Sequence, residues 1–277
     1  MAFGQGRYWK FRHKELLATQ RGRAVLNPMN CEQTSYVDDQ RECFDRVIMQ
    51  DWDSYLNPSW DKTRRFEVGR LLRLVSTPRR VLDVGCGSGY HDLLFAESPS
   101  IEQVIGIDSS PKSIEQATRH YSHPKVERYI ADVFDQEWLV RRFGRFDLVV
   151  SFQVIEHLSR PVAFLGACFE CTRDGGYVGV VTPNRNRVQN RLRVLLRRKP
   201  EVLDSLHYAE YNAEELVSMG QQKHLTFVGL FGCNFYLSLK GITLVGSKTP
   251  FSRTLGSWLP GLAHTVGIVF QKRPEGS

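Results

Sequence analysis

Residues 80–92, RVLDVGCGSGYHD, constrain the fold more than any other stretch of this chain. A short aliphatic run comes first, glycines at alternate positions follow, and a helix-like segment comes next. This order predicts a strand, a tight turn and a helix. Glycine allows positive φ angles and the close approach of a ligand to the backbone. The turn is therefore a candidate binding loop, built on Gly85, Gly87 and Gly89.

The loop does not have the pattern of a phosphate site. A dinucleotide fingerprint requires G-x-G-x-x-G, and a phosphate-binding loop requires Lys followed by Ser or Thr. Here the spacing is G-x-G-x-G, and Asp83 precedes the first glycine by two residues. A carboxylate at this place would oppose an anion at the start of a helix. A cationic cofactor with an amino-acid tail fits better.

The stretch VLDVGCGSG resembles motif I of the class I S-adenosylmethionine-dependent methyltransferases, and the resemblance continues through residues 79–183. It implies an α/β fold with a seven-stranded, mostly parallel, Rossmann-like sheet, an antiparallel last strand and an N-terminal helical cap. It also implies S-adenosyl-L-methionine as the cofactor. We expect a cap of helices and loops at 1–58 and a methyltransferase domain at 59–277, with insertions at about 186–206 and 237–262.

Composition indicates a globular, cytoplasmic protein. Hydrophobic residues make up 42% of the chain and charged residues 24%. We find neither an apolar run of the roughly 18 residues that span a bilayer nor the pattern of a secretory signal. The six cysteines are scattered, which favours reduced thiols. Cys168 and Cys171 form a lone C-x-x-C inside a predicted helix, where packing in the core is favoured over zinc.

Two acids follow predicted strands at positions that suit the cofactor. Asp108 ends the run VIGID, about 20 residues after the first glycine, where a carboxylate can accept the ribose hydroxyls. Capping of the next helix by Asp108, Ser109 or Ser110 is the alternative. Asp132 matches the acid that contacts adenine in relatives, although it also suits a turn. The cofactor-binding set implied by the resemblance is Asp83, Gly85, Cys86, Gly87, Gly89, Asp108, Ser109, Asp132, Val133, Phe152 and Gln153.

The segment RFDLVVSFQVIEHL at 145–158 predicts a buried central strand and a polar loop. The Q-V-I-E-H part resembles the loop after the fourth strand in ubiquinone-biosynthesis O-methyltransferases and their sugar and natural-product relatives. We expect His157 to act as general base, because its ordinary pKa lies near neutrality. Glu156 could orient this imidazole, act as a second base or share a divalent ion with it. The alternative is that both are loop and capping residues. No metal ligand is assigned.

The acceptor site is predicted from three further segments. The run Thr182–Arg187 resembles the T-x-N-R segment of the quinone-biosynthesis group, and an H-Y pair precedes the last predicted helix. For the histidine of this pair, a core or capping role is the alternative. The predicted acceptor-site residues are Tyr90, Asn184, Arg185, His207 and Tyr208.

The net charge of +7 is concentrated in residues 185–199, which hold seven basic residues and no acid. Val188, Leu192, Leu195 and Leu196 recur at helical spacing, which is typical of a basic amphipathic helix. We expect contact with an anionic membrane or anionic substrate through 187–199, with a solvated lid as the alternative. Nucleic acid is less favoured, because no aromatic platform is interleaved.

The expected function is methyl transfer from S-adenosylmethionine to a hydroxyl of a small molecule, such as a sugar, phenolic, quinone-type or natural-product acceptor. Transfer to nitrogen, carbon or RNA is the alternative among enzymes, and a non-catalytic cofactor-binding subunit is the alternative outside them. The long connection at 237–262 is a second candidate for contact with a lipid-like acceptor or a partner subunit, including a second copy.

Overall fold

The computed structural model describes residues 58–204, 206–239, 242–246 and 249–273. The chain divides into two compact units, 1–43 and 44–277, and every described residue belongs to the second unit. The predicted cap at 1–58 lies outside the described residues, except for Pro58.

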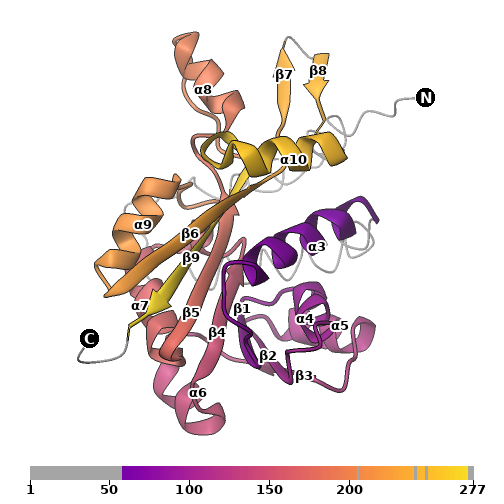
Figure 1. The fold of residues 1–277 in the computed structure, drawn as a ribbon, viewed down its shortest axis with the longest axis vertical. Helices are drawn as coiled ribbons and strands as arrows, with labels where there is room; N and C mark the ends of the chain where they lie inside the picture. The colour runs from indigo at the N-terminus through magenta and orange to yellow at the C-terminus, as the bar shows by residue number, and fades with distance from the viewer. Residues whose placement is uncertain (1–57, 205, 240–241, 247–248, 274–277) are drawn as a thin grey trace, which may run out of the picture. The chain divides into compact units, whose positions relative to one another are not determined.

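Seven strands form one sheet in the order β3-β2-β1-β4-β5-β9-β6 (Figure 1). The first five strands are parallel, and β9 lies between β5 and β6 and is antiparallel to both. The predicted seven-stranded, mostly parallel sheet with an antiparallel last strand is thus confirmed. The strands are β1 (Arg80–Val84), β2 (Gln103–Asp108), β3 (Val126–Ile130), β4 (Phe146–Phe152), β5 (Thr172–Pro183), β6 (Leu225–Cys233) and β9 (Thr265–Lys272).

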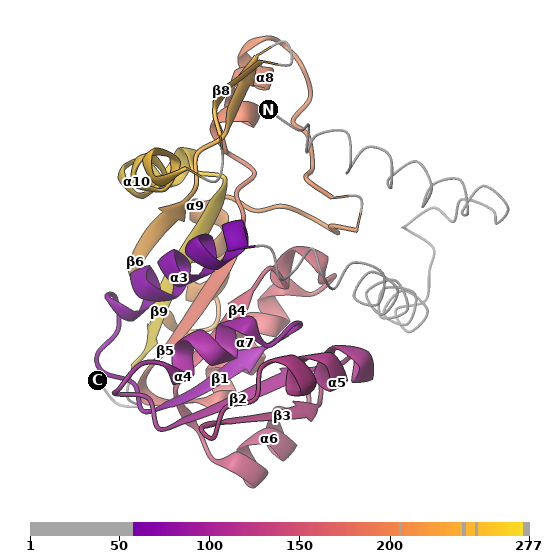
Figure 2. The ribbon, with the colours of Figure 1, turned by 90° about the vertical axis from the view of Figure 1, so that its right-hand side faces the viewer.

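Helices cover both faces of this sheet (Figure 2). One face carries α3 (Pro58–Leu72), α4 (Tyr90–Ala96) and α5 (Pro111–His120). The other face carries α6 (Gln136–Phe143), α7 (Pro161–Cys171) and α9 (Ala213–Gln221). Each face therefore has its own apolar core, as expected for a parallel sheet that is buried on both sides.

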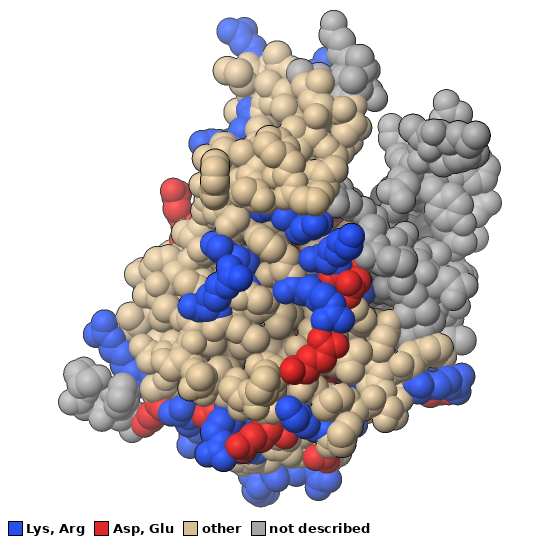
Figure 3. All heavy atoms as spheres, turned by 45° about the vertical axis from the view of Figure 1, so that its right-hand side comes forward, with Lys and Arg blue, Asp and Glu red and all other residues tan. Residues whose placement is uncertain are grey.

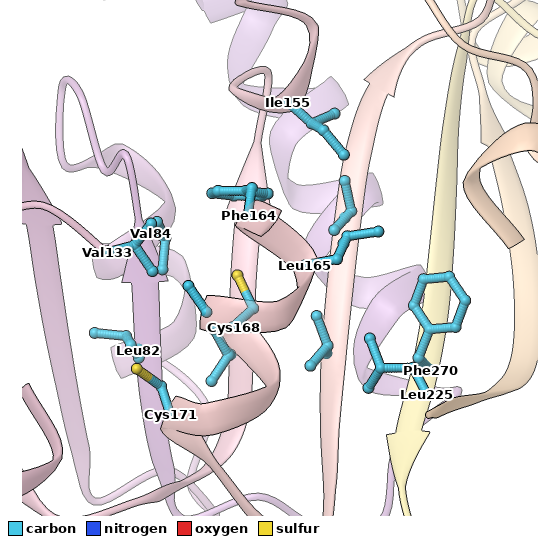
Figure 4. Close-up of a cluster of buried hydrophobic side chains, with 14 of the residues drawn as sticks. Leu82, Val84, Val133, Ile155, Phe164, Leu165, Cys168, Cys171, Leu225 and Phe270 are labelled. Carbon is cyan, nitrogen blue, oxygen red and sulfur yellow. The ribbon is translucent and has the colours of Figure 1, made fainter. Parts of the chain in front are cut away.

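Strand β1 shows how alternation builds the two cores. Val81 packs with the α3 and α4 side, whereas Leu82 and Val84 pack with the α6 and α7 side, because successive side chains of a strand point to opposite faces. Cys168 and Cys171 of α7 are buried in the apolar core on the α6 and α7 side, together with Leu82 and Val84 (Figure 4). The predicted core packing of the C-x-x-C is thus confirmed.

The structure differs from the sequence analysis mainly in its insertions. Residues 237–262 were expected as a connection, but they form a hairpin of β7 (Leu237–Leu239) and β8 (Ile242–Val245), then α10 (Pro250–Trp258) and a short η2 (Pro260–Leu262). The basic helix is α8 (Val188–Leu195) and is shorter than the predicted insertion. Helix α6 was not predicted. Among the described residues, no helix combines the length and the apolar character needed to cross a membrane.

Candidate functional site

The glycine loop after β1 adopts the backbone that its sequence predicts. Gly85, Gly87 and Gly89 have φ angles of 71°, 51° and 71°, which glycine takes without strain. A Cβ on Gly89 would lie 2.7 Å from the Cβ of Ala117, and a Cβ on Gly85 would overlap Val154. At Gly87 the nearest atom would be 3.9 Å away. Packing requires the outer two glycines, and the middle one borders open space that a ligand can fill.

Asp108 joins this loop to the start of α5. Its two carboxylate oxygens accept hydrogen bonds from the backbone N–H groups of Gly87, at 2.9 Å, and Ser110, at 2.8 Å. The N-cap of α5 is Ser110, whose hydroxyl oxygen accepts from the N–H of Ser113 at 3.0 Å. Asp108 therefore lies beside Gly87 without capping the helix. Its ribose contact stays a prediction, as does the cofactor contact of the adjacent Ser109.

Asp83 lies under the loop in a buried charge cluster that the sequence analysis did not recognise. Burial and the neighbouring carboxylate of Asp92 raise the pKa of Asp83 well above 3.8. Arg128 pairs with Asp92 at 2.7 Å, and both side chains are almost fully buried. Gly106 faces Asp83 across the β1–β2 register, and a Cβ there would lie 2.6 Å from the Asp92 carboxylate. Asp83 and the thiol of Cys86 are thus packed inside the base of the loop.

The predicted adenine-side residues lie at two strand ends. Asp132 is exposed after β3, and its carboxylate accepts from the N–H of Phe134 at 2.9 Å, as in a turn. Val133 is buried in the core cluster that also contains Val84 (Figure 4). Both positions are compatible with the predicted adenine contacts, which the structure does not test.

The end of β4 is held by backbone geometry and ring stacking. The Phe152 ring stacks on His91 at a centroid distance of 3.9 Å and an angle of 7°. Gln153 has a left-handed φ of 58°, and its N–H donates to the carbonyl of Val181 on β5 at 2.8 Å. This turn directs the following residues across the end of β5.

Glu156 is fully buried just after β4. The Thr182 hydroxyl donates to its Oε2 at 2.8 Å, whereas Oε1 accepts no hydrogen bond. Burial raises the pKa of Glu156 to about 7. Its backbone carbonyl accepts from the N–H groups of Tyr208, at 2.7 Å, and Ala209, at 3.1 Å. These two bonds bring the 206–211 segment against the loop after β4.

Two histidines complete the cluster. The rings of His157 and His207 meet edge to face at a centroid distance of 4.9 Å. Burial lowers the pKa of His157 to about 4, so this imidazole is neutral at neutral pH. A base of that strength acts poorly alone, which weakens the predicted role of His157 as general base. Ligand atoms of Glu156, His157 and His207 all lie within 4.8 Å of one another, so the cluster can hold a cation.

The other predicted acceptor-site residues do not join this cluster. The buried Asn184 amide donates to the carbonyls of Gly261 and Ala263, each at 3.0 Å. Arg185 pairs with Glu215 at 2.5 Å, and Tyr208 is half exposed. The Tyr90 ring meets the ring of Tyr121, the residue that follows α5, at a centroid distance of 5.1 Å. Of these five, only His207 brings its side chain to Glu156 and His157, and Tyr208 meets Glu156 through its backbone N–H.

Sequence reasoning missed the residues that hold His207 in place. Glu210 accepts from His207 and forms a buried ion pair with Arg187. The only sequence signal is an acid three residues after His207, which has no meaning without the fold.

The profile of a family described as "Methyltransferase domain" matches residues 60–228, which is more than half of the chain. The chain belongs to this family. This class I methyltransferase domain binds S-adenosylmethionine, and the family agrees with the motif I resemblance and the observed sheet order.

Curated relatives of this methyltransferase include ubiquinone biosynthesis O-methyltransferases. The one from Aromatoleum aromaticum is 36% identical over 110 residues, which are 39% of this chain and 45% of the relative. The one from Cereibacter sphaeroides is 35% identical over 107 residues, 39% of this chain and 42% of the relative. The chain thus matches less than half the length of these relatives.

Solved structures share the fold with this methyltransferase at low identity. A complex of the Haloferax volcanii Trm112 methyltransferase activator with a putative methyltransferase matches with 16% identity and a TM-score of 0.58, over 83% of this chain and 98% of that chain. The N-methyltransferase NodS of Bradyrhizobium japonicum with S-adenosyl-l-homocysteine matches with 15% identity and a TM-score of 0.52, over 84% and 98%.

Proposed function

We propose that this methyltransferase transfers a methyl group from S-adenosylmethionine to a hydroxyl of a small molecule. The observation that carries the proposal is the adjacency of two loops. Strands β1 and β4 are parallel neighbours, so the glycine loop and the Glu156–His157 loop open at the same edge of the sheet. The two loops also touch, because a Cβ on Gly85 would overlap Val154. A cofactor on the first loop therefore lies beside the polar cluster.

The polar cluster suits an acceptor that must lose a proton. The acceptor oxygen forms a bond to the methyl carbon as the carbon–sulfur bond breaks, and the electron pair returns to sulfur to give S-adenosylhomocysteine. The hydroxyl proton leaves through the cluster to solvent. A neutral amine attacks without prior loss of a proton, so a buried carboxyl group with two imidazoles favours oxygen over nitrogen. The names of the curated relatives agree with oxygen.

An amphiphilic acceptor is supported by a basic apolar surface at one end of the described fold. This surface comprises α8, the β7–β8 hairpin and α10, which lie at the same end of the ribbon in both views (Figures 1 and 2). Large apolar side chains are exposed there, including Leu195 at 78% and Trp258 at 77%. Residues 185–200 and 234–264 contain no acid.

The charge of this surface fits an anionic bilayer. In Figure 3 the uppermost part of the face is mostly uncharged, and the few charged side chains on it are Lys or Arg. Arg191, Arg197 and Arg198 are exposed, whereas Arg193 pairs with Glu201 at 3.2 Å. We therefore propose a cytoplasmic enzyme that contacts membranes peripherally and takes an acceptor with an apolar tail.

The test uses purified protein, labelled S-adenosylmethionine and a panel of phenolic, quinone-type and sugar acceptors, with and without apolar tails. We expect Glu156→Gln and His157→Ala to lower kcat at least about 100-fold while the affinity for S-adenosylhomocysteine stays unchanged. His120→Ala, on the exposed end of α5, is the matched control. Transfer to amines alone, or full activity of both cluster variants, would contradict the proposal.

A further inference from the structure

The cluster of Glu156, His157 and His207 has the composition and the size of a metal site. Two imidazoles and one carboxylate, one from each residue, offer ligand atoms that all lie within 4.8 Å of one another. Ligand atoms around a tetrahedral zinc ion lie roughly 3.4 Å apart, given bonds of about 2.1 Å. Closing the cluster around a cation therefore requires shifts of about 1 Å.

The hydrogen-bond partners of the two histidines determine which nitrogen of each ring carries the proton. Nδ1 of His157 lies 3.1 Å from the carbonyl oxygen of Leu206, and Nδ1 of His207 lies 3.2 Å from Oε1 of Glu210. Both partners only accept, so each Nδ1 must carry the proton. The lone pair of each ring is then on Nε2. Second-layer carbonyl and carboxylate acceptors of this kind are what orient histidine ligands in metal sites.

The carboxylate provides an independent observation. Glu156 is fully buried, yet its Oε1 accepts no hydrogen bond, while Oε2 is held by the Thr182 hydroxyl. An unsatisfied polar atom in the interior is costly, and a cation at this position would remove the cost. Thr182 fixes the orientation of the Glu156 carboxylate. In the same way, Leu206 and Glu210 fix the orientations of the two imidazole rings.

We infer that Glu156, His157 and His207 bind a divalent transition-metal cation, such as Zn²⁺, Mn²⁺ or Co²⁺. Two imidazole ligands favour these ions over Mg²⁺, which prefers oxygen ligands. Three protein ligands leave a coordination position open, where the acceptor hydroxyl can bind and lose its proton more easily. The inference builds on the proposed function, because it concerns the same site. It goes beyond the sequence analysis, which gave a divalent ion shared by Glu156 and His157 only as one of three alternatives and did not include His207.

The experiment measures cation binding without any acceptor. The full chain is stripped with EDTA, exchanged into chelator-free buffer and titrated calorimetrically with Mn²⁺ and Zn²⁺, and the visible spectrum of added Co²⁺ reports nitrogen ligation directly. We expect a site that His207→Ala and Glu156→Gln weaken at least 10-fold. Glu210→Gln is expected to weaken it about 10- to 100-fold through the orientation of His207. His120→Ala should leave the site unchanged.

Each variant is also titrated with S-adenosylhomocysteine, which shows that its cofactor half is folded. The inference is overturned if the wild-type protein binds this ligand but shows no Co²⁺ spectrum of nitrogen ligation, or if that spectrum persists in His207→Ala and Glu156→Gln. Methyl transfer to a hydroxyl without any bound cation would leave the proposed function standing and remove the cation site. A bound cation with no transfer to any hydroxyl acceptor would support the cation site and contradict the proposed function.

Discussion

Adding one methyl group at either of two glycines of the cofactor loop separates the effect on protein stability from the effect on ligand binding. Both Gly87 and Gly89 have positive φ, so alanine at either position costs about 1–2 kcal/mol in backbone strain. At Gly89 the new Cβ would also lie 2.7 Å from both Ala117 and the Arg128 guanidinium, and such overpacking adds about 1–3 kcal/mol. We expect Gly89→Ala to lower the free energy of unfolding by about 2–5 kcal/mol, and Gly87→Ala by about 1–2 kcal/mol.

Cofactor binding should show the opposite order. The methyl group of Gly87→Ala points into the open space beside Asp108, so the affinity for S-adenosylhomocysteine should fall at least about 10-fold. Urea unfolding of both variants gives the stabilities, and calorimetric titration gives the affinities. The reasoning fails if the two variants are equally stable, or if Gly87→Ala binds S-adenosylhomocysteine like the wild-type protein.

Three further outcomes are expected. Asp108→Ala should weaken S-adenosylmethionine binding at least 10-fold in a calorimetric titration, and unchanged binding would remove Asp108 from the ribose role. Burial lowers the pKa of His264 from 6.5 to about 4, so the unfolded chain takes up a proton on this histidine before the folded chain does. The free energy of unfolding therefore falls by at most about 3 kcal/mol as the pH falls from 6.5 to 4. In urea unfolding, the free energy of unfolding of His264→Gln should change less between pH 7 and pH 4.5 than that of the wild-type protein. Replacing Arg191, Arg197 and Arg198 by alanine should weaken sedimentation with anionic vesicles about 100-fold, at about 1 kcal/mol for each charge, whereas Lys62, Lys112 and Arg141 replaced together should not.

The parts that could be predicted from the sequence depend on local patterns. The strand, the alternate glycines and Asp108 are close together in the chain, and parallel strands bring their carboxyl ends to one edge, so the cofactor loop could be predicted from this local pattern and its resemblance to motif I. The Glu156–His157 pair was found in the same way. Ser110, one of three candidate caps, was decided only by the hydrogen bond that its side chain makes.

The remaining features depend on contacts between distant residues. Arg128 meets Asp92 across 36 positions, and His157 meets the Leu206 carbonyl across 49. Neither spacing has a sequence signature, and the raised pKa of Asp83 and the lowered pKa of His157 follow from burial that only the fold creates. The β7–β8 hairpin and α10 were missed because the apolar residues of 237–262 were interpreted as a long connection between two strands.

The position of β9 sets an order of assembly for the two sides of the site. Strands β5 and β6 are linked only through β9, whose residues 265–272 pair with partners 32 to 94 positions earlier in the chain. The loop after β5 also depends on this late segment, because the N–H of Asn184 donates to the His264 carbonyl at 3.0 Å. Strands β1 to β4, which present the cofactor loop, pair within residues 80–152. Closing long loops is slow, so the folding chain can complete its cofactor half first, while the acceptor half must wait for residues 265–272.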